Sequence, residues 1–274
     1  MLSAALSSGL SRHWCHQFRS NAHCSEIPWD DSYVLRPAER AAIADSVRQF
    51  QLGEGARGRG FLRRGSEFAS RIGDPAFAEA LRLFVAEEQR HSAFLARFLV
   101  RQKIPLQPAH WVNSSFRGLR KLAGLELCAT VLVTAELIAM PYYSALRRAT
   151  ASPMLQAICR RILRDETRHL QFQASMLARL RYGRSRLLQQ VSTAAHFAFL
   201  LGTMAIAWVQ HRSVFQRARV AFPQFSGECI RQMGGLIRET ERCRRALQEG
   251  SPNGSAENAP QNKRALEYRP AAPV

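Results

Sequence analysis

A Glu-x-x-His motif that occurs twice is the feature that most constrains this chain. The first copy lies in EEQRH (87–91) and the second in DETRH (165–169). In both copies an acidic residue precedes the Glu and an arginine precedes the His. Residues three apart share one face of an α-helix, so each Glu and His can bind a metal ion together. The sequence therefore predicts a repeated metal-ligand motif on two helices.

Each copy lies at the same distance from a helix start. Asp74-Pro75 and Ser152-Pro153 both combine a residue that favours the N-cap with a proline at the first helical position. The glutamates Glu88 and Glu166 each follow these caps by 14 residues. Two helices of similar design are therefore expected to present the two motifs at one level.

The spacing of apolar residues predicts an all-α protein, because it follows the helical period and little of the chain alternates as a strand would. The expected helices are 37–72 with a glycine-rich middle, 75–102, 118–150 with a kink at Pro141, 153–182, 187–210 and 226–248. The expected organisation is an irregular leader (1–37), a helical bundle (38–183), additional helices packed on the bundle or touching membrane (184–249), and a disordered tail (250–274).

A site for two metal ions needs one more carboxylate from each of the other two bundle helices. In an antiparallel helix pair, residues equally distant from the shared turn lie at the same level. With a rise of 1.5 Å per residue, Glu54 and Glu136 match the level of the two motifs. By the same measure Glu67 misses that level by about 13 Å and Glu126 by about 15 Å.

The predicted ligands form a charge-balanced set. They are Glu54, Glu88, His91, Glu136, Glu166 and His169. Four carboxylates neutralise two divalent cations, whereas four buried glutamates without metal would repel one another and become protonated. Oxygen and imidazole ligands suit iron, with manganese as the second choice. Candidates for orienting the histidines, or alternatively for ordinary ion pairs between helices, are Glu87, Arg90, Asp165 and Arg168.

The order Glu, Glu-x-x-His, Glu, Glu-x-x-His over about residues 45–180 resembles the ferritin-like di-iron carboxylate superfamily. It looks most like the oxygen-activating branch, which includes acyl-carrier-protein desaturases and arylamine N-oxygenases. The resemblance implies a four-helix bundle in which Glu88 and Glu166 bridge two irons and the other four ligands are terminal. Many of these enzymes carry a threonine one turn beyond the third-helix glutamate, where this chain has Ala139 and Met140.

The leading functional hypothesis is a di-iron, O₂-activating oxidoreductase of the hydroxylase, N-oxygenase or desaturase type. Its substrate would be a small or carrier-bound organic molecule, and electrons would come from an external reductase or ferredoxin, since the chain has no dinucleotide fingerprint. Tyr142 or Tyr143 could pass electrons to the site, although core packing is the favoured explanation for both. Two alternatives are an iron-handling (ferroxidase) or peroxide-scavenging protein and a basic protein that docks tRNA or an acyl carrier. A homo-oligomer is compatible with each.

The net charge of +18 comes mainly from arginine, because only 3 of the 39 basic residues are lysine. It indicates either an acidic partner or a compositional bias toward arginine. Six cysteines without a CxxC motif suit a reducing cytoplasm. Residues 187–210 contain no charged side chain and are flanked by Arg184, Arg186 and Arg212. We expect a buried or membrane-touching helix there, with a membrane span as the alternative.

Overall fold

The computed structural model describes residues 4–22, 27–55, 58–108 and 124–249. This part of the chain consists of α-helices and their connections, without a strand. The predicted all-α class is confirmed. The expected tail over 250–274 and the expected helix start at 118 lie outside the described residues.

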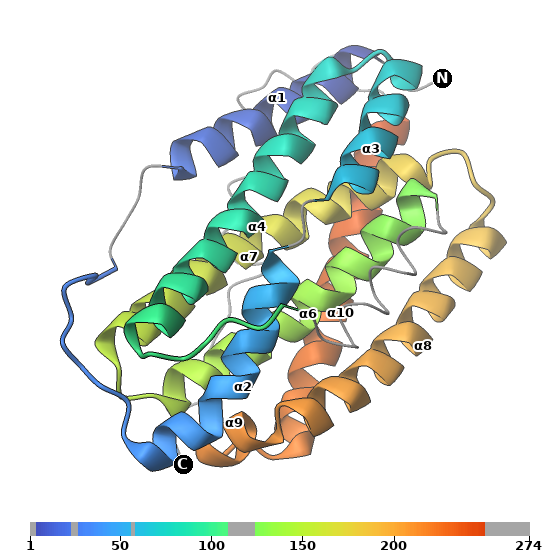
Figure 1. Ribbon diagram of the computed structural model, residues 1–274. Helices are drawn as coiled ribbons and strands as arrows, with labels where there is room; N and C mark the ends of the chain where they lie inside the picture. The colour runs from blue at the N-terminus through green and yellow to red at the C-terminus, as the bar shows by residue number, and fades with distance from the viewer. Residues whose placement is uncertain (1–3, 23–26, 56–57, 109–123, 250–274) are drawn as a thin grey trace.

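The centre of the molecule is a four-helix bundle in which two shorter helices in succession occupy one corner (Figure 1). Its elements are α2 (Pro37–Glu54) followed by α3 (Arg59–Ile72), α4 (Pro75–Arg101), α6 (Leu125–Ala149) and α7 (Pro153–Leu180). The helix α6 packs along α7, and α4 packs against α2, α3 and α7. Apolar side chains at helical spacing on all of these elements form one continuous core. This core surrounds the two Glu-x-x-His motifs.

The two Pro-started helices begin where they were predicted, but only one of them is capped by a side chain. Ser152 Oγ accepts a hydrogen bond from the backbone amide of Leu155, at 3.3 Å. Asp74 makes no such bond to α4. Its carboxylate instead accepts bonds from Ser11 at 2.7 Å and Arg179 at 3.2 Å. These buried partners compete with the helix end for the same oxygen.

The single helix expected over 37–72 is wrong, because the chain divides there into α2 and α3. The helix α2 ends at Glu54, and Gly58 before α3 has a left-handed φ of 57°. Glycine adopts this conformation without the steric cost that other residues meet. The glycine-rich middle of the segment is therefore a true break, and it places Glu54 at the C-terminal end of α2.

The irregular leader expected over 1–37 is wrong for its first part, because residues Ala4–Asn21 form helix α1, whereas residues 27–36 are non-helical as expected. This helix lies beside α4 (Figure 1), and it buries Trp14, Cys15 and Phe18. The Phe18 ring packs edge-on against Phe172 of α7, with ring centroids 5.3 Å apart. Tertiary burial of this apolar face stabilises the helix.

Three further helices follow the bundle: α8 (Arg186–Gln210), α9 (Arg212–Arg217) and α10 (Phe222–Glu249). The helix α10 packs on α7 and α6, and α8 packs on α6, α9 and α10. Both α6 and α8 are long and apolar enough to cross a membrane. However, 78% of the most apolar window of α6 is buried in the protein, compared with 28% for α8. The helix α6 is therefore a core helix, whereas α8 is largely uncovered.

Candidate metal centre

The two Glu-x-x-His pairs face each other from α4 and α7 in the middle of the bundle. The imidazoles of His91 and His169 are fully buried, with ring centroids 5.6 Å apart. The Nδ1 atom of His91 lies 3.6 Å from a Glu166 carboxylate oxygen and 4.0 Å from Glu88. The Nδ1 atom of His169 lies 2.8 Å from Glu88 and 3.3 Å from Glu166. Each histidine therefore faces both glutamates.

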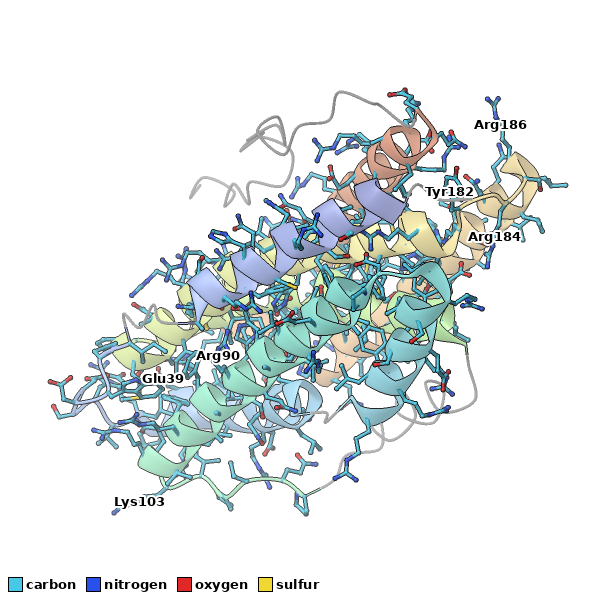
Figure 2. All side chains as sticks on the ribbon, turned by 90° about the horizontal axis from the view of Figure 1, so that it is seen from above. Glu39, Arg90, Lys103, Tyr182, Arg184 and Arg186 are labelled. Atoms are coloured by element: carbon cyan, nitrogen blue, oxygen red, sulfur yellow. The ribbon has the colours of Figure 1, made fainter. Side chains whose placement is uncertain are left out.

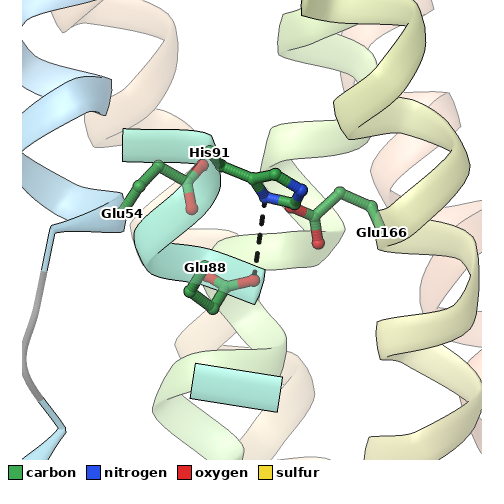
Figure 3. Close-up of side chains that lie close together, drawn as sticks. All are labelled: Glu54, Glu88, His91 and Glu166. Atoms are coloured by element: carbon green, nitrogen blue, oxygen red, sulfur yellow. Dashed lines mark ion pairs between the residues drawn. The ribbon is translucent and has the colours of Figure 1, made fainter. Parts of the chain in front are cut away.

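The two remaining predicted carboxylates reach the same place. Glu54 comes from the end of α2, and Glu136 comes from the middle of α6. The candidate ligand atoms form two groups, each with all atoms within 4.8 Å of one another. The groups are Glu54, Glu88, His91 and Glu166, which Figure 3 shows, and Glu88, Glu136, Glu166 and His169. All six predicted residues thus lie together, and the two groups share Glu88 and Glu166.

Each histidine is held by a carboxylate of the opposite helix. His91 Nε2 lies 3.0 Å from Asp165 Oδ2, and His169 Nε2 lies 3.1 Å from Glu87 Oε2. Burial alone would raise the pKa of Asp165, but hydrogen bonds from His91 and Arg161 hold that pKa well below its ordinary value. Because the ionised carboxylate can only accept, Nε2–H of His91 must donate. This tautomer leaves the Nδ1 lone pair directed at the carboxylate cluster.

The two orienting carboxylates are tied to each other by a network of cationic and amide donors. Arg90 donates to Glu87 at 2.8 Å, and Arg168 donates to Asp165 at 2.5 Å. Asn21, the last residue of α1, donates to both carboxylates through its side-chain amide. Buried Arg161 donates to Asp165 at 2.8 Å and also to the Asn21 carbonyl oxygen at 2.7 Å. The four residues predicted to orient the histidines therefore do contact them or their carboxylate partners.

Several buried polar atoms that point into this cluster make no hydrogen bond of normal geometry, although some lie close to one another. They are Glu88 Oε1, Glu136 Oε2, Glu166 Oε2, His91 Nδ1 and His169 Nδ1. Buried polar groups are normally satisfied, and an unsatisfied one is costly. All five are oxygen or imidazole nitrogen atoms of the kind that bind iron or manganese. The donor set therefore fits a pair of metal ions.

The pKa shifts of the candidate ligands also indicate a site for cations. Burial and the charge of Glu88 raise the pKa of Glu54 well above its ordinary value. Burial and the charge of Glu166 do the same for Glu136. Burial would lower the pKa of His169, but the adjacent carboxylates, Glu166 first, raise it well above the usual range. The protein therefore holds protons here in the absence of a cation, and two divalent cations would replace them.

Two further residues contact the ligands: Gln173, which was not identified from the sequence, and Tyr143, which was considered there only for electron transfer or core packing. Gln173, one turn beyond His169, donates to Glu136. Tyr143 on α6 donates to Glu54 Oε1 at 2.7 Å. Its ring is fully buried, and burial together with the Glu54 charge raises the pKa of its hydroxyl well above 10. The tyrosine therefore remains protonated and restrains Glu54, whereas Tyr142 bonds instead to Ser46 at 2.8 Å.

An apolar cavity of about 180 Å³ lies beside the cluster, between α2, α6 and α8. Four of the candidate ligands, Glu54, Glu88, Glu136 and Glu166, form part of its wall. Its other lining residues are Gln49, Phe50, Gly53, Val131, Leu132, Ala135, Ile138, Ala139, Thr203, Ile206, Ala207, Gln210 and His211. Gly53 and Ile206 are exposed, so the cavity reaches the surface between α2 and α8.

The position one turn beyond Glu136 contributes no hydroxyl group to the cavity, because Ala139 occupies it. The nearby Thr134 turns away from the cavity. Its hydroxyl donates to the carbonyl oxygen of Thr130 at 2.7 Å and contacts Nε2 of His196, on α8, at 3.0 Å. The absence of a threonine one turn beyond Glu136, noted in the sequence, therefore leaves the cavity wall without a hydroxyl group at that position.

Comparison with solved structures finds an R2-like ligand-binding oxidase with an aerobically reconstituted Mn/Fe cofactor. The two structures align with a TM-score of 0.62, over 84% of this chain and 92% of the other, at 16% sequence identity. The fold is that of the ferritin-like helical bundles. No protein-family model matches the chain, and no curated protein matches its sequence. The ferritin-like bundle provides the four inward-facing carboxylate positions that Glu54, Glu88, Glu136 and Glu166 occupy.

Proposed function

We propose that the protein binds two metal ions, iron or iron with manganese, and acts as an O₂-activating oxidoreductase on an apolar organic substrate. The observation that carries this proposal is the pair of four-residue groups that share Glu88 and Glu166. Each group supplies one histidine and three carboxylates. The shared glutamates suit bridging positions, and the other four ligands suit terminal ones.

The structurally similar oxidase, with its Mn/Fe cofactor, supports the choice of metals. A bound metal pair would supply the redox chemistry that no side chain can provide alone. The protein's own contribution is to keep the site apolar and to fix both imidazoles through Asp165 and Glu87. Tyr143 restrains Glu54 through its hydroxyl, so one terminal carboxylate is held from outside the metal pair.

The cavity indicates the class of substrate. Its wall beside the candidate ligands consists mainly of apolar side chains such as Val131, Ile138 and Ala139. Such a cavity suits an uncharged organic group better than a hydrated ion. This favours an oxygenase or oxidase reaction on an organic molecule over iron storage. Electrons would come from a separate reductase or ferredoxin, and the basic surface suits an acidic protein of that kind.

Metal analysis of the purified chain tests the metal centre. We expect about two ions per chain after loading with Fe²⁺, and an absorption band in the near ultraviolet after O₂ is admitted. The double variant E88Q/E166Q should bind less than one ion, because both shared carboxylates are lost. The matched control is E67Q on α3, since Glu67 is exposed and pairs only with Arg63 in the described structure.

Equal metal content in E88Q/E166Q and the native protein would contradict the proposed centre. The choice between oxygenase and iron storage requires a second measurement. We expect O₂ consumption that depends on an added electron donor and on an apolar substrate. Light scattering that shows a hollow shell of many subunits would instead support iron storage.

A further inference from the structure

An apolar stripe runs along the outer side of α8, which forms one edge of the molecule (Figure 1). We call this surface the α8 stripe. Its large members are between 39% and 71% exposed and are Leu187, Leu188, Val191, Leu201, Ile206 and Val209. Between them lie exposed alanines and a glycine, namely Ala194, Ala195, Ala198, Gly202 and Ala205. Contiguous apolar surface of this length marks an interaction site.

The opposite face of α8 is anchored to the protein. His196, Leu200 and Met204 are buried against the bundle. The helix therefore lies alongside its neighbours α6, α9 and α10 and does not project from them. A helix held in this way can lie in the plane of a membrane surface with only its outer side in contact with lipid.

Basic residues flank the stripe at both ends. Arg186 and Arg212 are exposed, and neither forms an ion pair within the described part of the chain. Figure 2 shows Arg184 and Arg186 at the N-terminal end of α8, with Arg186 projecting outward. From Arg184 to Arg245 the sequence has 10 arginines and 3 glutamates, a difference of +7. In the structure, all three glutamates pair with arginines of α10.

We propose that the α8 stripe docks on an anionic lipid bilayer, with α8 parallel to the surface and its flanking arginines among the headgroups. The apolar residues would enter the headgroup boundary, and Arg186 and Arg212 would attract negative charge. A second copy of the chain fits this surface less well. Whether two α8 helices packed parallel or antiparallel, each arginine-bearing end would face another arginine-bearing end.

The stripe also borders the mouth of the cavity, because Ile206 belongs to both. A docked protein would present this opening to the bilayer, so an apolar substrate could enter without crossing water. This consequence rests on the proposed function, whereas the docking itself does not. The test therefore measures binding to lipid, with metal content recorded separately for each variant.

Co-sedimentation of the full chain with vesicles tests the apolar part of the surface. We expect binding to phosphatidylcholine vesicles that contain phosphatidylglycerol, weaker binding to pure phosphatidylcholine, and a decrease with added salt. V191E should weaken binding about tenfold, because it removes an apolar side chain from the lipid contact and adds a negative charge. The matched control is V100E on α4, where the valine is similarly exposed, at 63% compared with 57% for Val191.

A second pair of variants tests the charges. R186A/R212A should weaken binding to the anionic vesicles about ten- to thirtyfold, given the contribution of each arginine near such a surface. The control R82A/R160A removes two exposed arginines from α4 and α7. Equal losses in both double variants would show non-specific attraction and overturn the proposal. Equal losses of vesicle binding in V191E and V100E would also overturn the proposal. So would a native protein that does not bind vesicles but forms a dimer, if V191E reduces its molecular mass in solution by half.

All variants should retain the metal content of the native protein. Loss of vesicle binding with metal content intact would support the docking surface independently of the reaction. Tight binding of tRNA or of an acidic carrier protein that V191E leaves unchanged, with no binding to vesicles, would assign the basic surface to that partner and overturn the proposal.

Discussion

At the scale of single residues, the orientation of the two imidazoles is the most informative feature. Each Nε2 is engaged by an ionised carboxylate of the opposite helix, so each Nδ1 faces three of the four glutamates. Glu87 and Asp165 are in turn bridged by the side-chain amide of Asn21. The two halves of the site are therefore coupled through a residue that binds no metal itself.

The substitution D165N tests this coupling. A neutral amide cannot support the His91 tautomer as strongly, so we expect metal affinity to fall by about ten- to a hundredfold while the fold is retained. Metal titration followed by circular dichroism measures both. The control is E79Q on α4, where Glu79 pairs with the exposed Arg19. Unchanged affinity in D165N would show that the imidazole is positioned by packing alone.

Protons held by the metal-free ligands predict a pH dependence. Burial and neighbouring charge raise the pKa of Glu54 and Glu136, so these groups stay protonated at pH values where free glutamate is ionised. Metal binding should release protons, and apparent metal affinity should increase with pH. Calorimetric titration in two buffers with different ionisation enthalpies measures the release. The same heat in both buffers would contradict it.

At the scale of elements, α8 combines an uncovered outer side with a buried polar residue on its inner side. Burial lowers the pKa of His196 to about 4 from 6.5, and its Nε2 contacts the Thr134 hydroxyl at 3.0 Å. The folded state therefore favours neutral imidazole. The preference of the folded state for neutral His196 contributes fully to the stability of the protein above pH 6.5. This contribution is lost as pH falls from 6.5 toward 4, because the unfolded chain then binds a proton that the folded protein does not.

The substitution H196Q tests this contribution, because glutamine can retain the hydrogen bond but does not titrate. Between neutral pH and pH 4, the native protein should lose about 3 kcal/mol more stability than the variant, as an upper bound. Urea unfolding at several pH values measures the difference. H16Q on α1 is the control, since His16 is exposed. Parallel stability curves for native protein and H196Q would exclude a role for this histidine.

Helix α1 shows how an element can complete a site without carrying a recognisable motif. It is held by the Ser11 and Arg179 contacts to Asp74, and Phe18 packs near His169 with ring centroids 6.0 Å apart. Its last residue, Asn21, then meets the two orienting carboxylates. The sequence does not predict this role for Asn21, because asparagine is common at helix ends.

At the scale of the whole molecule, the cluster of buried carboxylates opposes folding unless a cation is present. Metal should therefore stabilise the protein strongly. At a free Mn²⁺ concentration about 100 times the dissociation constant, the expected gain is about 2.7 kcal/mol, or a rise in Tm of about 5 °C. Differential scanning measures it. The double variant E88Q/E166Q should show no such rise, and a similar rise in that variant would place the bound metal elsewhere.

The bundle helices and the six candidate ligands were predictable because their signals are local and periodic. The two Glu-x-x-His motifs, the Pro-started helices and the level of Glu54 and Glu136 all follow from helical geometry. The break between α2 and α3 was visible only as a cluster of glycines, and the sequence did not distinguish a weakened helix from an ended one. Gly58 decides this by adopting a left-handed conformation.

By itself, then, the sequence determined the helical class and the residues that could bind metal, because spacing along a helix fixes which side chains share a face. Tertiary structure alone decided which partners surround those ligands. Asn21 and Tyr143 reach the site from positions distant in the chain, and their contacts depend on how the helices cross. Tertiary structure also decided the environment of the two apolar helices. The helices α6 and α8 have similar hydropathy, but α6 is enclosed by other helices and α8 is not, because packing alone determines which helix surfaces remain exposed.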